Sequence, residues 1–283
     1  MFDDDPDWRV YFGAIANLYH NHPVRIDIAG TCDTVNNTYK DMLELCYHTF
    51  YHPHNMMLFV VGNIQPEELV DVIRENQNKK HFLPETSIQR KKIEEPESVA
   101  VKEQIDIMQV EMNKLIVSIK INDILTNPQE KIKRELSFNL LFDLYFSKSS
   151  VLYNEWLSKG YINETFSANF TQERDYAFIL MGGDQDDYHL LQKTIFDFIE
   201  HIDDLVIEQE DFERIKRKTI GNFINSYNSP ESIANSFSRY YFEGICSFEL
   251  VDYVSKITIA DLNEVKKYFN KEYASSYIVK KDK

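Results

Sequence analysis

The chain has 283 residues, of which 43% are hydrophobic and 13% aromatic, so it can bury one large core or two ordinary ones. Its formal net charge of −15 argues against nucleic-acid partners, which require clustered Lys and Arg, and favours basic peptides. The widely spaced Cys32, Cys46 and Cys246 fit neither a disulfide framework nor a four-ligand zinc site, and so indicate a reducing compartment.

No segment of the sequence is expected to enter a membrane. The longest apolar run, residues 56–61, is far shorter than a membrane span. The N-terminus opens with Asp3, Asp4 and Asp5, where a signal peptide would have Lys or Arg. We therefore expect a cytoplasmic protein.

The first part of the chain alternates helical and strand patterns. Apolar side chains at helical spacing predict helices over residues 8–19 and 39–50. The apolar run 56–61 predicts a buried strand that ends at Gly62. Pro66 followed by two glutamates predicts a helix to about Asn76.

A polar stretch from about Asn76 to Ser98 has mixed charges and little apolar periodicity, which is typical of a linker. It divides the chain into a first domain over residues 1–80, a linker over 81–99 and a second domain over 100–283.

The second domain is expected to mix strands and helices. Alternation predicts strands over residues 115–121 and 166–170, and a continuous apolar run predicts one over 176–181. A short strand is expected at 277–279. Helical spacing or capping residues predict helices starting at Asn127-Pro128, Tyr188, about Phe212, Ser229-Pro230 and Thr258.

Two segments share one plan, which suggests an internal repeat. Residues 41–61 and 261–279 each read as an acidic helix start, an aromatic helix end, a polar gap and an apolar strand, about 220 residues apart. The first copy would then lack about 120 residues at its front, so Met1 is interpreted as the start of a truncated product. Chance similarity of two short segments is the alternative.

Several runs resemble the insulinase/pitrilysin (inverzincin) family of zinc metallopeptidases, in particular its bacterial zinc proteases. They are residues 17–24 (NLYHNHPV), 29–31 (AGT), 50–56 (FYHPHNM) and 58–63 (LFVVGN), with weaker similarity at 149–153, 159–160 and 181–184. The resemblance implies an α+β fold of two related domains with antiparallel-rich sheets covered by helices, the first domain N-terminally truncated.

The resemblance also implies where the metal would be. The family holds zinc with a His-x-x-Glu-His helix and a later Glu, and none of these is present here. We therefore assign no catalytic, cofactor-binding or metal-binding residue to this chain, and expect zinc only in the full-length protein. The second-domain counterpart of the zinc motif falls near Glu135 to Phe142.

Active members often use an Arg and a Tyr of the second domain to hold the substrate carbonyl. Here Ser158 and Asn163 stand at about those places and no Arg lies between Tyr153 and Asn163. This departure implies that a homologous subunit completes the cleft.

Other constellations have ordinary structural interpretations. His48, His52 and His54, with His20 and His22 nearby, suggest a metal site, but Pro53 interrupts the helical face and no Cys or carboxylate accompanies them at ligand spacing. Asp197, Glu200 and His201 resemble the inverted zinc motif within an amphipathic helix.

Two further polar runs are candidates for binding an ion or a phosphate group. Asp3 to Asp7 lacks the glycine turn of a calcium loop and is expected to cap a helix. Gly182-Gly183-Asp184 lacks the Lys of a phosphate loop.

The leading hypothesis is the C-terminal portion of a zinc-dependent peptidase, in which this chain forms the substrate-chamber wall and is inactive alone. The alternative is a non-catalytic structural or substrate-holding partner of an active homologue. A stand-alone peptide-binding module is the third hypothesis, which requires the shortened first domain to fold by itself.

Overall fold

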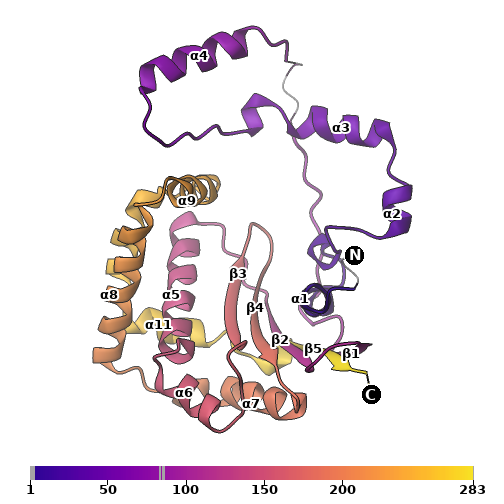
Figure 1. Cartoon of the computed structure of the whole chain (residues 1–283), viewed down its shortest axis with the longest axis vertical. Helices are drawn as coiled ribbons and strands as arrows, with labels where there is room; N and C mark the ends of the chain where they lie inside the picture. Colours follow the sequence, from indigo (N-terminus) through magenta and orange to yellow (C-terminus); the bar gives the residue numbers. More distant parts are fainter. Residues whose placement is uncertain (1–3, 83, 85–86, 283) are drawn as a thin grey trace. The chain divides into compact units, whose positions relative to one another are not determined.

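The computed structural model describes residues 4–82, 84 and 87–282 (Figure 1). Within these, the chain forms two compact units. The first unit draws on the ranges 1–29, 93–222 and 249–283, and the second on 30–92 and 223–248.

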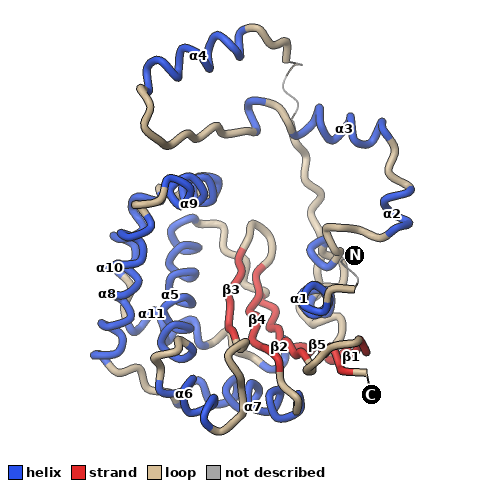
Figure 2. Tube along the Cα trace, viewed as in Figure 1, coloured by secondary structure: helices blue, strands red, loops and turns tan. Residues whose placement is uncertain are grey.

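A five-stranded mixed sheet forms the centre of the first unit (Figure 2). Its strands are β1 (Glu103–Met108), β2 (Lys114–Ile121), β3 (Ser167–Gln172), β4 (Ala177–Asp184) and β5 (Ala274–Lys281). Their order is β1-β5-β2-β4-β3, with β1 parallel to β5 and the other neighbours antiparallel. The expected α+β class with an antiparallel-rich, helix-covered sheet is therefore confirmed.

Several helices of the first unit begin at capping residues that the sequence displays. The α-helices of this unit are α1 (Pro6–Leu18), α5 (Pro128–Phe146), α6 (Val151–Ser158), α7 (Tyr188–His201), α10 (Leu250–Lys256) and α11 (Ile259–Lys266), while α8 (Gln209–Ser226) runs on into the second unit. Asn127 accepts hydrogen bonds from the backbone N–H groups of Gln129 and Glu130, and Thr258 forms a capping box with Asp261.

Each face of the sheet is covered by helix. The alternation of strand side chains places Ile119, Ile179 and Ile278 on one face, where α5 and α7 pack. Phe178 and Tyr277 lie on the other face under α1. All five side chains are almost completely buried, so the core of this unit is two layers deep.

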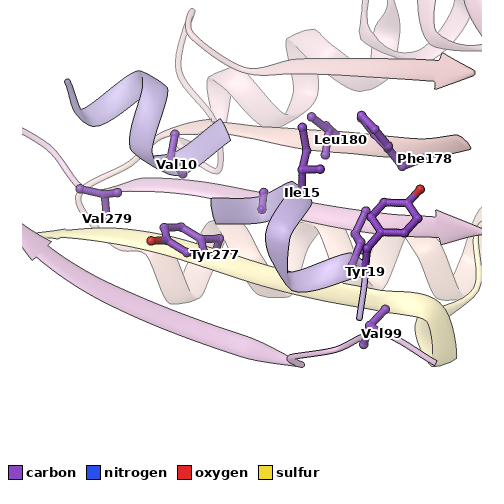
Figure 3. Close-up of a cluster of buried hydrophobic side chains, with 10 residues drawn as sticks. Val10, Ile15, Tyr19, Val99, Phe178, Leu180, Tyr277 and Val279 are labelled. Atoms are coloured by element: carbon purple, nitrogen blue, oxygen red, sulfur yellow. The ribbon is translucent and has the colours of Figure 1, made fainter. Parts of the chain in front are cut away.

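Close contacts fix α1 on the sheet (Figure 3). A Cβ on Gly13 would lie 2.2 Å from ring atoms of Tyr277, so only glycine allows the helix this close to β5. Arg9 donates to Asp106 at 2.7 Å, and the Tyr277 hydroxyl donates to the same carboxylate at 2.5 Å. Ser118 donates to the carbonyl of Ala14 at 3.2 Å.

The second unit is mostly helical and contains few buried side chains. It comprises α2 (Cys32–Asn36), α3 (Lys40–Phe50), α4 (Pro66–Asn78) and α9 (Pro230–Phe242). Neither α3 nor α4 buries a side chain, although both are amphipathic. Phe59 stacks on Phe237 of α9 with ring centroids 4.2 Å apart.

The strand predicted at residues 56–61 is wrong for this structure. The segment follows a short 3-10 helix, η2 (Pro53–Asn55), and pairs with no strand among the described residues. A strand needs a neighbouring strand to pair its backbone N–H and C=O groups. The only sheet in the described part of the chain lies in the first unit, and residues 56–61 do not pair with it.

The order of elements still follows the suggested repeat. In the first unit α11 leads through η5 (Lys271–Tyr273) into β5, just as α3 leads through η2 into the extended segment 56–61. Residues 274–281 pair with neighbouring strands and form β5, whereas residues 56–61 pair with no strand in the described part of the chain. The residue ranges proposed for the two domains and the linker remain a prediction. In the structure, the α1 segment belongs to the unit that contains the sheet.

Candidate functional site

The helix that would contain a second metal motif contributes instead to the core. In α5, Leu136, Phe138 and Leu141 are at most 1% exposed. Phe138 stacks on Phe170 of β3 with ring centroids 4.1 Å apart. An apolar, aromatic face of this kind binds no divalent cation, because it offers no anionic or imidazole ligand.

A buried arginine next to this core organises the polar end of the same helix. Arg134, which is 5% exposed, donates to the Gln172 side chain at 2.7 Å and to the Asp123 carbonyl at 2.7 Å. It also donates to the Tyr268 hydroxyl at 3.2 Å, and that hydroxyl donates to the Asp123 carboxylate at 2.5 Å. Burial raises the pKa of Tyr268, so this hydroxyl stays protonated as a donor.

A cavity of about 280 Å³ opens between α5 and α11 beside this arginine. Its charged lining is largely paired, since Lys133 lies 2.6 Å from Asp261 and Arg134 lies 3.6 Å from Asp123. Partial burial works to raise the pKa of Asp261, but hydrogen bonds from Lys133 and Thr258 hold it below its ordinary value. A carboxylate stabilised as the anion is a poor proton acceptor at neutral pH, so Asp261 is poorly suited to act as a general base.

A second buried charge connects the segment before β1 to the sheet. Lys120 of β2, with a 2% exposed side chain, contacts Glu95 at 2.7 Å and the Pro96 carbonyl at 2.6 Å. The Glu95 carboxylate also accepts from the backbone N–H groups of His20, Asn21 and His22, each at 2.8 Å. Partial burial opposes these bonds, but together they lower the pKa of Glu95 to about 2.

The histidines near residue 50 lie in the second unit, where His52 and His54 contact each other. His52 accepts from the backbone N–H of His54, and their rings lie 5.0 Å apart. His48 contacts Tyr47. His20 and His22 lie in the other unit, where His22 caps a short 3-10 helix.

The motif-like run in α7 has structural contacts. Glu200 forms an ion pair with Lys271, which lowers the Glu200 pKa. The His201 ring contacts the carbonyl of Asp197 at 2.8 Å, one helical turn earlier. These contacts direct the side chains to their own helix and to η5.

The acidic and glycine-rich runs also have structural roles. Asp5 caps α1 by accepting from the N–H groups of Asp7 and Trp8, whereas Asp3 lies outside the described residues. Gly182 lies within β4, which extends to Asp184. A Cβ at this position would lie 2.0 Å from the Leu115 carbonyl oxygen, so the pairing with β2 requires glycine here. The predicted end of this strand before the glycines is therefore too early.

Ser158 and Asn163 make local contacts. The Ser158 hydroxyl donates to the Glu155 carbonyl in the last turn of α6 at 2.9 Å. The Asn163 side chain accepts from the N–H and hydroxyl of Thr165. Each side chain is hydrogen-bonded within its own turn, and no hydrogen bond joins Ser158 to Asn163.

The described residues do not form a zinc site. Among the described residues, no group of three or more His, Cys, Asp or Glu side chains has an arrangement that could hold a metal ion. We therefore derive no chemical step through a metal for this chain. No helix in the described ranges is long and apolar enough to cross a membrane.

Sequence reasoning missed the buried charges. Lys120 lies between Ile119 and Ile121 in β2, and Arg134 lies between Ile132 and Leu136, so burial was readable from their neighbours. Their partners Glu95 and Gln172 are distant in sequence, so no local sequence pattern could identify these two contacts.

These observations define the class of fold, which is a mixed sheet covered by helices on both faces with an aromatic core around α5. A sequence model of the family described as "Peptidase M16 inactive domain" matches residues 38–219, which is more than half of the chain. The chain belongs to the M16 peptidase family, and the resemblance to insulinase-type zinc metallopeptidases is thereby confirmed.

Individual relatives agree with this assignment. The "uncharacterized zinc protease YmfH" of Bacillus subtilis is 43% identical over 265 residues, which are 94% of this chain and 62% of that protein. The zinc protease PqqE of Helicobacter pylori is 24% identical over 98% of this chain and 62% of its own length. This chain thus spans less than two thirds of both relatives.

Solved structures show the same fold. An M16-like peptidase from Alicyclobacillus acidocaldarius superposes with a TM-score of 0.93 at 29% identity, covering 100% of this chain and 67% of that one. A protease from Helicobacter pylori gives a TM-score of 0.83 at 21% identity, over 98% and 67% of the two chains.

Proposed function

We propose that this chain is the C-terminal, non-metal portion of a zinc-dependent peptidase and forms the wall of its substrate chamber. The observation behind the proposal is the apolar, stacked face of α5 around Phe138, at the place where a metal motif would stand. The match to an inactive peptidase domain supports it. Zinc and the catalytic groups then belong to a part of the whole protein outside these 283 residues.

The proposed substrates are unfolded or extended peptides. The net charge of −15 favours basic segments, and a mixed sheet with open edge strands offers backbone groups for strand addition. A homologous subunit is the proposed protein partner. Three exposed, unpaired cysteines, all within the described residues, are compatible with a reducing, cytoplasmic location, which we also propose.

The test compares this chain with a product extended along the upstream reading frame to include a His-x-x-Glu-His motif. Zinc content is measured after dialysis, and cleavage is measured on an unfolded basic peptide. We expect the short chain neither to retain stoichiometric zinc nor to cleave, and the extended product to do both.

Two other results have clear meanings. Zinc-dependent cleavage by the short chain would overturn the proposal. Extended protein that folds but neither binds zinc nor cleaves would favour the alternative, a non-catalytic partner that holds substrate for an active homologue. The description of the matching family as an inactive domain is the observation that favours this second function.

A further inference from the structure

The cavity between α5 and α11, which we call the α5–α11 cavity, contains charged groups that the chain does not pair with each other. Its volume of about 280 Å³ is just below the range of about 300–1,000 Å³ that is typical of sites for drug-sized ligands. All the described residues that line it belong to the first unit. The cavity therefore suits a molecule smaller than a drug.

The first of these groups is the guanidinium of Arg134, which lines the cavity and is almost completely buried. Its Nε and Nη1 atoms donate to Gln172, Asp123 and Tyr268, but its Nη2 atom has no hydrogen-bond partner among the described residues. The Asp123 carboxylate lies 3.6 Å from Nη1, beyond hydrogen-bond distance, and already accepts from Tyr268. A buried charged donor without an acceptor is costly, so an anionic oxygen that reaches Nη2 is bound favourably.

The second group is the exposed carboxylate of Glu130 in the same lining. Glu130 lies four residues before Arg134 in α5, so the two side chains share one face of the helix with Cβ atoms about 5–6 Å apart. A Glu and an Arg at this spacing commonly form an ion pair, but none joins them here, because Arg134 is directed to Asp123 and Gln172. Within the described ranges Glu130 has no other ion-pair partner.

The rest of the lining limits what the cavity can bind. Lys133 is paired with Asp261, and Lys267 with Glu264 at 3.7 Å. The described lining has four acidic and three basic side chains, so a ligand with only negative charge, such as phosphate, is disfavoured.

Two apolar residues complete the described lining on which the argument depends. They are Leu125 and Val265, which offer contact to an aliphatic group. The matching ligand is therefore small and has an anionic group, a cationic group and an aliphatic part.

We propose that the α5–α11 cavity binds a free amino acid with an aliphatic side chain. The ligand carboxylate accepts from Nη2 of Arg134, and the ligand ammonium group donates to Glu130. Both ligand charges are attached through one α-carbon, so they fit between two protein groups that are one helical turn apart. The aliphatic side chain contacts Leu125 and Val265.

This inference goes beyond the proposed function and does not depend on it, because binding is measured on this chain without zinc or cleavage. The probe is L-leucine, and binding to the whole chain is followed by a ligand-observed NMR titration. We expect a dissociation constant of about 1 mM or below. Isocaproate lacks the ammonium group and isoamylamine lacks the carboxylate, and each should bind about tenfold more weakly or worse.

Two variants address the two charged groups separately. Glu130→Gln should weaken L-leucine binding by about tenfold and leave isocaproate binding unchanged, because only L-leucine has the ammonium group. Arg134→Lys keeps the positive charge but loses the forked donors, and should weaken the binding of both ligands. Glu210→Gln is the matched control, since it removes the same charge from the first turn of α8, outside the cavity, and should change neither.

Glu130→Gln keeps the proposal testable if Arg134→Lys does not fold, because Glu130 is exposed and circular dichroism verifies the fold of each variant. The proposal is overturned if L-leucine at about 10 mM gives no binding to the wild-type chain. It is also overturned if isocaproate binds as tightly as L-leucine, or if Glu130→Gln and wild type bind L-leucine equally well. Binding of inorganic phosphate in place of L-leucine would show a simple anion site and would contradict the proposal.

Discussion

Replacing Glu95 by Gln tests how strongly the segment before β1 is bound to the sheet. The carboxylate accepts three backbone N–H bonds and contacts the buried ammonium group of Lys120. An amide of the same shape keeps one oxygen but places an NH2 group among these donors. The substitution therefore leaves Lys120 without its charged partner in a site with only 2% side-chain exposure.

The lowered pKa of Glu95 gives the size of the expected change in the free energy of unfolding. A shift from 4.5 to about 2 corresponds to about 3 kcal/mol of unfolding free energy when the carboxyl is ionised in both states. Because the folded-state pKa is the lower one, this stabilisation is complete above the unfolded-state value. It is lost as pH falls from about 4.5 toward 2, and about 2 kcal/mol remains near pH 3.5.

Urea unfolding followed by circular dichroism measures the effect at several pH values. We expect Glu95→Gln to lower the free energy of unfolding by about 3 kcal/mol near pH 7, with a smaller difference from wild type near pH 3.5. Glu94→Gln removes the same charge from the adjacent exposed side chain and should change little. A Glu95→Gln effect below about 1 kcal/mol, or one independent of pH, would refute the reasoning.

Further predictions concern packing. Gly13→Ala places a Cβ into the Tyr277 ring and should lower the unfolding free energy by about 1–3 kcal/mol, whereas Gly221→Ala, with open space around it in α8, should be neutral or stabilising by up to about 1 kcal/mol. Equal urea midpoints for the two variants would contradict the close approach of α1. Phe138→Ala should cost about 3–5 kcal/mol by removing a buried ring stacked on Phe170, and a loss under about 1 kcal/mol in thermal or urea unfolding would contradict its place in the core.

Local patterns in the sequence predicted most element positions. Asn127-Pro128 and Ser229-Pro230 marked the starts of α5 and α9, because capping and the fixed φ of proline act within one turn. The alternation of residues 115–121 matched β2, whose side chains face two different helix layers. These features depend on neighbours in sequence, so a single sequence displays them.

The remaining features depend on contacts between distant residues. β1 was not predicted, because Glu103 and Asp106 make it look polar and its partner β5 lies at the other end of the chain. The segment 56–61 has a strand pattern but no partner strand in the described part of the chain. The buried contacts of Lys120 were missed for the same reason, since its acid lies on a segment that reads as a linker.

The measurement that tests the central claim most directly is the zinc content of this 283-residue chain, determined by elemental analysis after equilibration with zinc and dialysis. The account predicts well below one zinc per chain, with an unchanged circular dichroism spectrum when a chelator is added. One tightly held zinc per folded chain, removed together with structure or peptide cleavage by the chelator, would contradict the assignment of this chain to the non-metal portion of the peptidase.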